Sequence, residues 1–164
     1  MDSDPTKIEL LTDPLTQHMS GYTNHGNHYF DVPFISQIEG NLWQGGCETG
    51  LVLPEFIEHL VSLYPWEQYT VKHHLKSTHT FRMYDGYDVD GVIIDAAANL
   101  INALIQDGVT LVHCQAGLNR SSFVAARALM LQGMSGKEAI KLIRANRSPV
   151  CLCNVTFEQW LLTH

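Results

Sequence analysis

Hydrophobic positions recur with a helical period over much of the chain, above all in its second half. Apolar residues three or four positions apart lie on one face of a helix, and five stretches show this spacing. They begin near Pro54, Asp95, Arg120, Ser135 and Asn154. Proline in a first turn, or Asp, Ser or Asn just before it, is typical of helix starts, whereas glycine is typical of helix ends. The pattern therefore predicts five helices.

Shorter stretches carry the alternation or the apolar run of a β-strand. Residues 69–75 and 78–83 alternate between apolar and polar side chains, and Leu42–Gln44 is a short strand candidate. Residues 109–112 are nearly all apolar, which is typical of a strand buried inside a sheet. Helices mixed with short strands predict an α/β fold, in which a central mixed, mostly parallel sheet is flanked by helices on both faces.

The beginning of the chain differs from the rest because its periodicity is weak and its turn-forming residues are frequent, for example Asp13-Pro14 and Gly26. Such residues favour turns over regular elements. Residues 1–34 are therefore predicted to form an irregular arm of unknown role with short turns at best. Residues 35–164 are expected to form one globular domain.

The composition is that of a folded domain rather than a disordered segment, with 164 residues, 45% hydrophobic and 16% charged. No apolar run approaches the roughly 20 residues that a membrane helix needs, and the start lacks the basic and apolar stretches of a secretory signal. We therefore expect a cytoplasmic protein without a membrane partner, in an oligomeric state that stays open. The net charge of −7 argues against binding of double-stranded nucleic acid, which needs clustered Lys and Arg.

A predicted buried strand is joined to a predicted helix by the segment His-Cys-Gln-Ala-Gly-Leu-Asn-Arg-Ser at positions 113–121. A loop in that place can curl so that its backbone N–H groups point inward, and the start of the helix adds its positive end. Gly117 permits the backbone angles of such a ring, and Arg120 supplies a planar fork that matches two phosphate oxygens. The predicted phosphate-binding residues are Gln115, Ala116, Gly117, Leu118, Asn119 and Arg120.

The same positive field acts on Cys114. A cysteine among N–H groups at a helix start loses its proton more easily, and only the thiolate is a good nucleophile. Ser121 is expected to donate a hydrogen bond to the sulfur and to assist the release of phosphate. His113 is expected to support the loop from behind rather than to act as a base. Together these residues predict a phosphatase that works through a covalent phosphocysteine.

The order His-Cys-x5-Arg-Ser resembles the signature of the cysteine-based protein tyrosine phosphatase superfamily, and the chain length resembles its small dual-specificity branch. Asn41–Gly45 resembles an early strand of that branch, and Asn154–Leu161 resembles its last helix. Cys153, where the family often has proline, departs from the pattern. The resemblance covers the chain from about residue 36 onward. It implies a phosphotyrosine protein phosphatase-like fold and a phosphorylated protein or peptide substrate, with phosphoserine and phosphothreonine as candidates beside phosphotyrosine.

The resemblance also implies a general acid, an aspartate on a mobile loop upstream of the cysteine that protonates the leaving oxygen. Three candidates lie in the Tyr-Asp-Gly-Tyr-Asp-Val-Asp stretch at positions 84–90. Asp85 fits the spacing best, and Asp88 is the alternative. Asp90 comes third, because an aspartate there can instead cap the following helix.

Two other interpretations of the same loop stay open. Gly-Leu-Asn-Arg at 117–120 also resembles a related branch that removes phosphates from RNA 5′ ends. That branch is typically more basic and has a threonine after the arginine, where this chain has Ser121. A non-catalytic phosphate-binding module is the third interpretation, although Cys114 and Arg120 are both present. The uncharged residues between those two weaken the case for a lipid phosphatase, which often places lysines there.

The remaining cysteines and histidines predict no metal site. Cys151 and Cys153 are too close in sequence for a zinc pair, and His73 and His74 would point to opposite faces of a strand. No metal and no cofactor are therefore expected, and the thiols are expected to be free in a reducing compartment. Cys47 is a candidate to form a protective disulfide with the nucleophilic cysteine on oxidation, as some relatives do with a nearby thiol.

Overall fold

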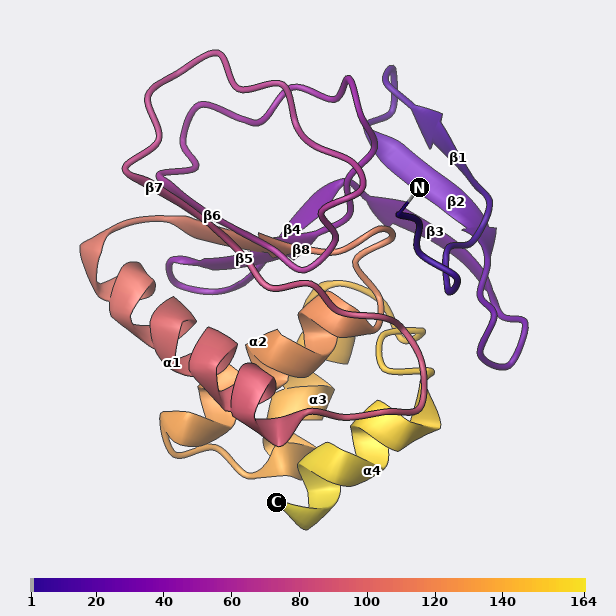
Figure 1. The fold of residues 1–164 in the computed structure, drawn as a ribbon, viewed down its shortest axis with the longest axis vertical. Coiled ribbons are helices and arrows are strands. Elements are labelled where there is room, and N and C mark those ends of the chain that lie inside the picture. The colour runs from indigo at the N-terminus through magenta and orange to yellow at the C-terminus, as the bar shows by residue number, and fades with distance from the viewer. Residues whose placement is uncertain (1) are drawn as a thin grey trace.

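The computed structural model describes residues 2–164, which form two sheets and four helices (Figure 1). A five-stranded sheet lies at the centre, and a three-stranded sheet lies beside it. The strands are β1 (Leu10–Asp13), β2 (His18–Tyr22), β3 (Tyr29–Pro33), β4 (Ile35–Glu39), β5 (Leu42–Gly45), β6 (His59–Ser62), β7 (Ser77–Thr80) and β8 (Thr110–His113). The helices are α1 (Gly91–Asp107), α2 (Arg120–Leu131), α3 (Gly136–Asn146) and α4 (Val155–Thr163).

The central sheet has the strand order β4-β5-β8-β6-β7, with β8 in the middle. β8 runs parallel to β5 and β6, β6 runs parallel to β7, and β4 is antiparallel to β5. His113, the last residue of β8, pairs with Gly45 and with Ser62. The segments that follow these three strands therefore leave the sheet at one edge, where ligands of parallel sheets commonly bind. The predicted α/β class with a central mixed, mostly parallel sheet is confirmed.

Successive residues of the central strands point to opposite faces of the sheet. Val61 and Val112 belong to the core that the helices share, whereas Leu60 and Leu111 belong to a second core. The loop side chains that close the second core are Cys47, Leu53, Ile57 and Tyr69. All four helices lie on one face of the sheet in Figure 1, and loops lie on the other. This arrangement differs from the expected helices on both faces.

Two of the predicted elements are wrong, and both lie in or next to the loops that cover the second core. The segment that begins at Pro54 forms a turn and then strand β6 instead of a helix. All four residues of β6 are buried, so the apolar spacing around Leu60 that suits a helix also suits a strand covered on both faces. The segment 69–75 is not a strand, because Thr70 makes only an isolated parallel bridge with Val52.

The other predicted elements are confirmed with small shifts. β5, β7 and β8 match the strands expected at 42–44, 78–83 and 109–112, and α2, α3 and α4 match three of the expected helices. Ser135 and Asn154 cap α3 and α4 as predicted, each through a side-chain oxygen that accepts from amides of the first turn. Within the described part of the chain, no helix combines the length and the apolar character needed to cross a membrane.

Helix α1 begins earlier than Asp95, and the alternative that Asp90 caps it is confirmed. Asp90 is the N-cap, and its carboxylate accepts hydrogen bonds from the amides of Val92 and Ile93 at 3.0 and 3.3 Å. Asp95, the predicted cap, lies inside the helix and forms an ion pair with Arg127 of α2 at 2.7 Å. The extra turn extends α1 toward the loop that carries the candidate general acids.

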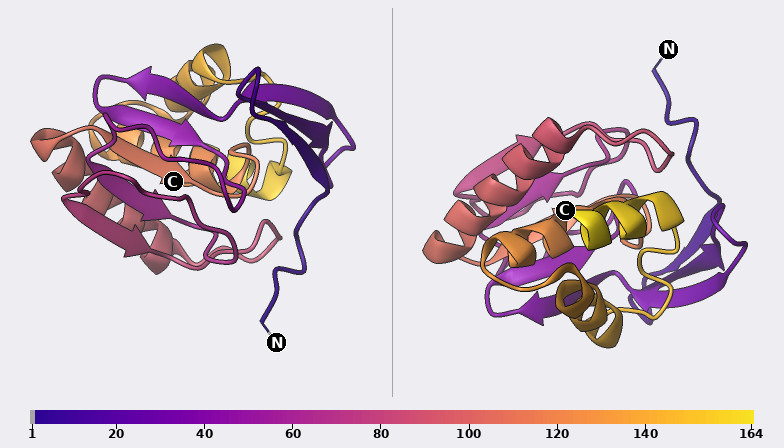
Figure 2. Two further views of the ribbon diagram at one scale, coloured as in Figure 1. Left: turned by 90° about the horizontal axis from the view of Figure 1, so that it is seen from above. Right: turned by 90° about the horizontal axis from the view of Figure 1, so that it is seen from below.

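The arm is a regular sheet, which corrects the expectation of an irregular segment. β1, β2 and β3 pair antiparallel and lie beside the edge of the main body (Figure 2). Met19, Phe30 and Val32 point from this sheet into the main core and are almost fully buried. Met19 lies against Gly46, just after β5, since a Cβ built on Gly46 would be 2.4 Å from the Met19 sulfur. The arm therefore packs against the sheet edge where β5 and β8 end.

Candidate active site

The candidate active site lies where β8 ends and α2 begins. Residues 114–119 connect these two elements, and Arg120 is the first residue of α2. Gly117 has φ +71°, and a Cβ there would lie 2.4 Å from the carbonyl carbon of Gly45. Glycine alone meets both conditions without strain. The sequence-based expectation of a sharp loop between strand and helix is therefore matched by the backbone.

Every carbonyl oxygen of residues 115–118 accepts a hydrogen bond from a group behind the loop, on the side turned away from the cavity that Cys114 lines. The donors are the Cys47 amide (2.9 Å), two guanidinium nitrogens of Arg147 (2.6 and 3.0 Å), the Gln44 side chain (3.0 Å) and the Leu152 amide (2.9 Å). In a planar trans peptide, a carbonyl that points outward turns the N–H of the next residue inward. The amides of 116–119 therefore face the inside of the loop, and within residues 2–164 they donate to no protein group. The loop is a ring of free donors.

Arg147 is the main support of this ring, and sequence reasoning missed it. Its guanidinium binds the carbonyl oxygens of Ala116 and Gly117, and it also donates to the Pro33 carbonyl (2.9 Å) and the Ser36 hydroxyl (3.0 Å). The side chain is buried, so its charge is satisfied by these oxygens rather than by water. No local pattern marks this residue, because its partners lie far away in sequence.

Cys114 lies at the bottom of the ring and is 3% exposed. The Ser121 hydroxyl lies 3.4 Å from its sulfur, within hydrogen-bonding distance. Gln44 from β5 donates to the Ser121 hydroxyl at 3.1 Å and to the Ser122 hydroxyl at 2.5 Å, which fixes both side chains. The structure thus brings the predicted nucleophile and the predicted hydroxyl donor together.

His113 lies behind the ring and does not reach into it. Its Nδ1 faces the Cys114 carbonyl oxygen at 3.1 Å, and its ring packs edge-on against Tyr69. Burial lowers the pKa of His113 to about 4, against the opposing effect of the hydrogen bond to the Cys114 carbonyl. The imidazole is therefore neutral at pH 7, and its position fits the predicted supporting role.

Arg120 is as buried as Cys114, at 3% exposed. Its Nη1 donates to the Met83 carbonyl oxygen at 3.0 Å, and its guanidinium lies 5.0 Å from the centre of the Tyr64 ring. The same Nη1 donates to the Asp4 carboxylate at 2.7 Å. Asp4 comes from the arm, and nothing in the sequence singled it out.

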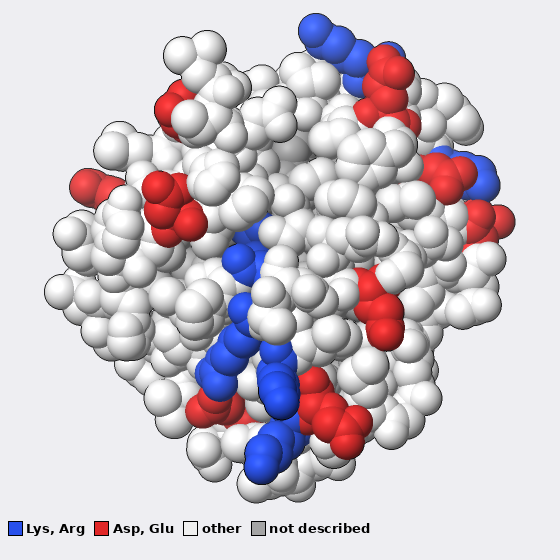
Figure 3. Space-filling view, turned by 180° about the vertical axis from the view of Figure 1, so that it is seen from behind, with Lys and Arg blue, Asp and Glu red and all other residues white. Residues whose placement is uncertain are grey.

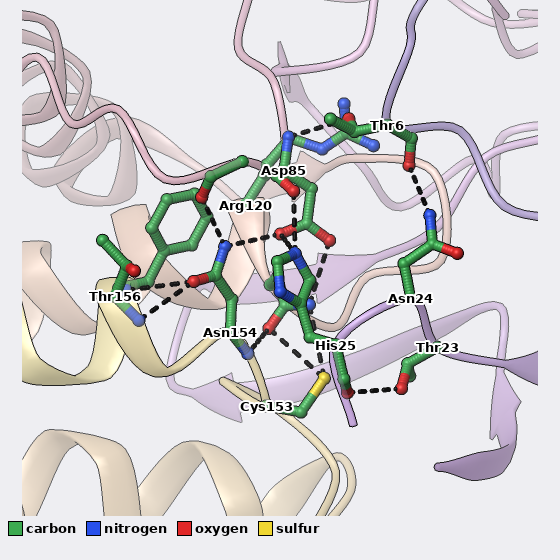
Figure 4. A network of polar contacts seen from close by, with 12 residues as sticks. Thr6, Thr23, Asn24, His25, Asp85, Arg120, Cys153, Asn154 and Thr156 are labelled. Atoms are coloured by element: carbon green, nitrogen blue, oxygen red, sulfur yellow. Dashed lines mark hydrogen bonds and ion pairs between the residues drawn. The ribbon is translucent and has the colours of Figure 1, made fainter. Parts of the chain in front are cut away.

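Asp85 lines the same cavity as Cys114 and Arg120. Figure 4 shows its carboxylate at the centre of a polar network that joins the arm, the loop and the start of α4. Asn119 donates to one carboxylate oxygen at 3.0 Å, and Asn154 donates to the other at 2.9 Å. Asn119 and Asn154 are also tied together, since the Asn154 amide donates to the Asn119 side chain at 2.9 Å.

His25, on the connection between β2 and β3, is a third partner of Asp85 that sequence reasoning missed. Its Nε2 lies 2.8 Å from the Asp85 carbonyl oxygen and 3.2 Å from the carboxylate. Burial would raise the pKa of Asp85, but the hydrogen bonds from His25, Asn154 and Asn119 outweigh it and lower the pKa. The hydrogen bond to Asp85 in turn raises the pKa of His25.

The other two aspartates of the 84–90 stretch do not face the ring. Asp88 is exposed and lines a separate hollow beside Phe123 and Phe157. Asp90 caps α1. Of the three candidates, the structure brings Asp85 alone to the wall of the cavity that holds Cys114.

The arm closes the site from the front. Thr6, Ile8, Thr23 and Asn24 face the residues of the 114–120 loop, and the cavity left between them has a volume of about 20 Å³. A single water needs roughly 10–15 Å³ of such space. The cavity therefore has room for about one water molecule in this conformation.

A family model for the dual specificity phosphatase catalytic domain matches residues 67–164, more than half of the chain. The chain belongs to this family. A search of curated proteins found no sequence match.

Solved structures of phosphatases and of a phosphatase-like protein share the fold of this member of the dual specificity phosphatase family. Human DUSP28 is 17% identical with a TM-score of 0.67, covering 78% of this chain and 95% of its own. The human tyrosine phosphatase-like serine/threonine/tyrosine-interacting protein is 19% identical with a TM-score of 0.65, covering 79% and 93%. OH1 from the Orf virus, a tyrosine phosphatase with triple substrate specificity, is 21% identical with a TM-score of 0.62, covering 79% and 84%. At these identities the likeness establishes the fold.

The thiols of this family member are all free, and Cys47 lies next to the loop. The Cys47 amide donates to the Gln115 carbonyl oxygen at 2.9 Å, and burial raises the pKa of the Cys47 thiol. Its pairing with Cys114 on oxidation stays a prediction. Among residues 2–164 there is no group of three or more His, Cys, Asp or Glu side chains placed to hold a metal ion.

Proposed function

We propose that the chain hydrolyses phosphate monoesters through a phosphocysteine formed on Cys114, with residues 35–164 as the catalytic domain. The observation that supports this proposal most is the ring of loop amides that face inward above Cys114. The ring keeps its shape because the carbonyl oxygens of the loop accept hydrogen bonds from groups behind it. Such a ring stabilises the oxygens of a phosphate, and the start of α2 adds positive potential. Arg120 supplies the cationic fork at its rim.

In the first step the Cys114 thiolate attacks phosphorus, an S–P bond forms, and the ester P–O bond breaks. Asp85 gives its proton to the leaving oxygen, while the loop amides and Arg120 hold the three phosphoryl oxygens. In the second step water attacks phosphorus and the S–P bond breaks. Asp85 accepts the proton of the water, and Ser121 stabilises the departing thiolate. The products are an alcohol or phenol and inorganic phosphate.

Phosphorylated proteins or peptides are the proposed substrates, with phosphotyrosine first and phosphoserine or phosphothreonine beside it. Membership of the dual specificity phosphatase family supports this class. The loop residues between Cys114 and Arg120 are uncharged. On the face seen in Figure 3, Lys and Arg form a stripe that ends among acidic side chains, and the other Lys and Arg side chains seen there also lie next to Asp or Glu. An RNA 5′ end would favour a broader basic surface.

The proposal is tested by comparing rates on a phosphotyrosine peptide, the matching phosphothreonine peptide and a 5′-triphosphate RNA. We expect turnover of the peptides by the wild-type chain and none by Cys114→Ser. Faster release of phosphate from the RNA would replace the peptide with an RNA 5′ end as the substrate. Tight binding of the phosphopeptide without turnover of any of the three would contradict catalysis and indicate a phosphate-binding module.

A further inference from the structure

The segment of residues 4–8 contacts the groups that the proposed reaction needs. The Asp4 carboxylate accepts a hydrogen bond from Arg120 Nη1 at 2.7 Å, and the Asp4 side chain has no exposed surface. The Thr6 hydroxyl oxygen accepts a hydrogen bond from the Asp85 amide at 2.9 Å. One short segment therefore binds both the predicted phosphate clamp and the backbone of the predicted general acid.

Gln115, the first residue of the ring, binds the backbone of Ile8. Its Nε2 donates to the Ile8 carbonyl oxygen at 2.6 Å, and its Oε1 accepts from the Ile8 amide at 3.0 Å. A side-chain amide has one acceptor and one donor group, so it can pair with both polar groups of one residue whatever that residue's side chain is. Gln115 is thus placed to hold a peptide across the mouth of the ring.

The segment is shaped for this position by its own hydrogen bonds. The second carboxylate oxygen of Asp4 accepts from the Thr6 amide at 2.8 Å and from the Thr6 hydroxyl at 2.6 Å. The Asp4 carbonyl oxygen accepts from the Lys7 amide at 3.2 Å, which closes a turn. This turn orients the carboxylate toward Arg120, and Asn24 of the arm also holds it by donating to the Thr6 carbonyl oxygen at 3.4 Å.

A phosphate and this segment exclude each other for two reasons. The cavity of about 20 Å³ between the segment and the ring is too small for a phosphoryl group with a substrate attached. The Asp4 carboxylate also neutralises Arg120, and a second anion beside it would be repelled. Binding of a phosphate monoester therefore requires that residues 4–8 leave.

We propose that the ring and Gln115 form a binding site for a short acidic peptide turn, and that residues 4–8 of the chain itself occupy it as an internal competitor of phosphate. The inference rests on the proposed function, because it takes the ring to be the phosphate site. In this arrangement the Asp4 carboxylate takes the place of the substrate phosphate, and the Gln115 side chain binds peptide backbone. Substrates bind only to open molecules, in which the segment is displaced. The apparent affinity is therefore the intrinsic affinity multiplied by the fraction of open molecules.

The test is an NMR titration of the full-length ¹⁵N-labelled chain with inorganic phosphate, against chloride at equal ionic strength. The Gly117 amide shift reports phosphate in the ring, and hydrogen exchange of the Ile8 amide reports release of the segment. Asp4→Asn removes the charge that competes. Asp31→Asn is the matched control, because Asp31 is an exposed arm aspartate whose one ion-pair partner among residues 2–164 is His18.

We expect exchange at Ile8 to accelerate as phosphate saturates the wild-type chain. We also expect Asp4→Asn to bind phosphate about tenfold more tightly, as for a closed state populated about ten times more than the open one, while Asp31→Asn leaves affinity unchanged. An Ile8 amide that stays protected at saturating phosphate would overturn the inference, as would equal or weaker binding by Asp4→Asn. If Asp4→Asn does not fold, the wild-type exchange result decides alone.

The two proposals fail in different ways. Phosphate that binds at Gly117 and releases Ile8 in a chain that turns over no substrate would sink the proposed function and leave the inference standing. Turnover of phosphopeptide with Ile8 still protected would sink the inference alone. Absence of phosphate binding in both the wild-type chain and Asp4→Asn would contradict both.

Discussion

The 114–120 loop is bound on two sides by contacts of different kinds. Behind it, Arg147 and Gln44 are buried and bind carbonyl oxygens of the buried residues Ala116 and Gly117. In front of it, residues 4–8 and 23–25 of the arm make a few polar contacts over a small cavity. Loss of a buried donor leaves an unsatisfied acceptor, whereas groups that separate at the front can bind water instead. The back of the loop is therefore built to stay in place, and the front is built so that it can open.

The largest effect is expected at the Cys114 sulfur, which lies between the groups behind the loop and the arm in front of it. Cys114→Ser should lower turnover of an aryl phosphate by roughly 10⁴-fold or more, as for removal of other catalytic nucleophiles. Steady-state phosphate release measures it. Cys47→Ala is the control, because Cys47 is a buried thiol outside the ring, and it should keep most of the activity. A Cys114→Ser protein with substantial turnover would contradict the assignment of the nucleophile.

The next largest effect is expected at Asp85, the proposed general acid, which lies between the 114–120 loop and the arm. Asp85→Asn should lower kcat on a phosphopeptide by ~10² to 10⁴-fold, because the leaving oxygen loses its proton donor. Asp88→Asn, at an exposed position outside the cavity, should change kcat little. The reverse result for the two variants would move the general acid to Asp88.

The back of the loop is tested by Arg147→Met, which keeps much of the buried volume but removes the donors. We expect a loss of about 2–4 kcal/mol in the free energy of unfolding, because the carbonyls of Ala116 and Gly117 lose buried partners. Urea denaturation measures this loss. Arg82→Met, at an exposed arginine, should stay within about 0.5 kcal/mol of the wild-type chain. Equal stability of the two variants would contradict the view that the back is held by buried donors.

The front is tested by the pH dependence of His25→Asn. A general acid works while protonated, and the hydrogen bond from His25 lowers the pKa of Asp85. Without that hydrogen bond the pKa of Asp85 rises, so the upper pH limit of turnover should move to higher pH. The pH profile of kcat/KM measures the shift, with His28→Asn, an exposed histidine on the same connection, as the control. A shift toward lower pH would contradict the assigned pair.

The same pair changes stability with pH in a direction that follows from the two shifts. The pKa of Asp85 is lowered from 3.8, so its contribution is present above that value and is lost as pH falls through the lowered pKa. The pKa of His25 is raised from 6.5, so its contribution is present below that value and is lost as pH rises through the raised pKa. The stability difference between the wild-type chain and His25→Asn should therefore be largest between these two values, as measured by urea midpoints across pH.

The loop itself and the groups that hold it from front and back differ in how far the sequence predicts them. The 113–121 segment is continuous, and its cysteine, glycine and arginine stand at fixed offsets, so local rules suffice to predict a loop between strand and helix. Arg147 and Asp4 lie far from that segment in sequence and reach it only through tertiary packing. Local spacing therefore carries no sign of either residue.

The fold shows the same limit. Capped helices such as α3 and α4 are predicted correctly, because Ser135 and Asn154 satisfy amides within their own first turn. Strand β6 is mistaken for part of a helix, because burial on both faces removes the alternation that marks a strand. The arm sheet is missed because Met19, Phe30 and Val32 are few and depend on the main body for their burial.

The most direct test of the central claim is to trap the covalent intermediate. The wild-type chain would be mixed rapidly with an aryl phosphate, quenched in acid within one turnover, digested and examined by mass spectrometry. We predict one phosphoryl group on the sulfur of Cys114, formed at least as fast as steady-state turnover and absent from Cys114→Ser. Turnover with no phosphoryl group on Cys114, or with the group on another residue, would contradict the account.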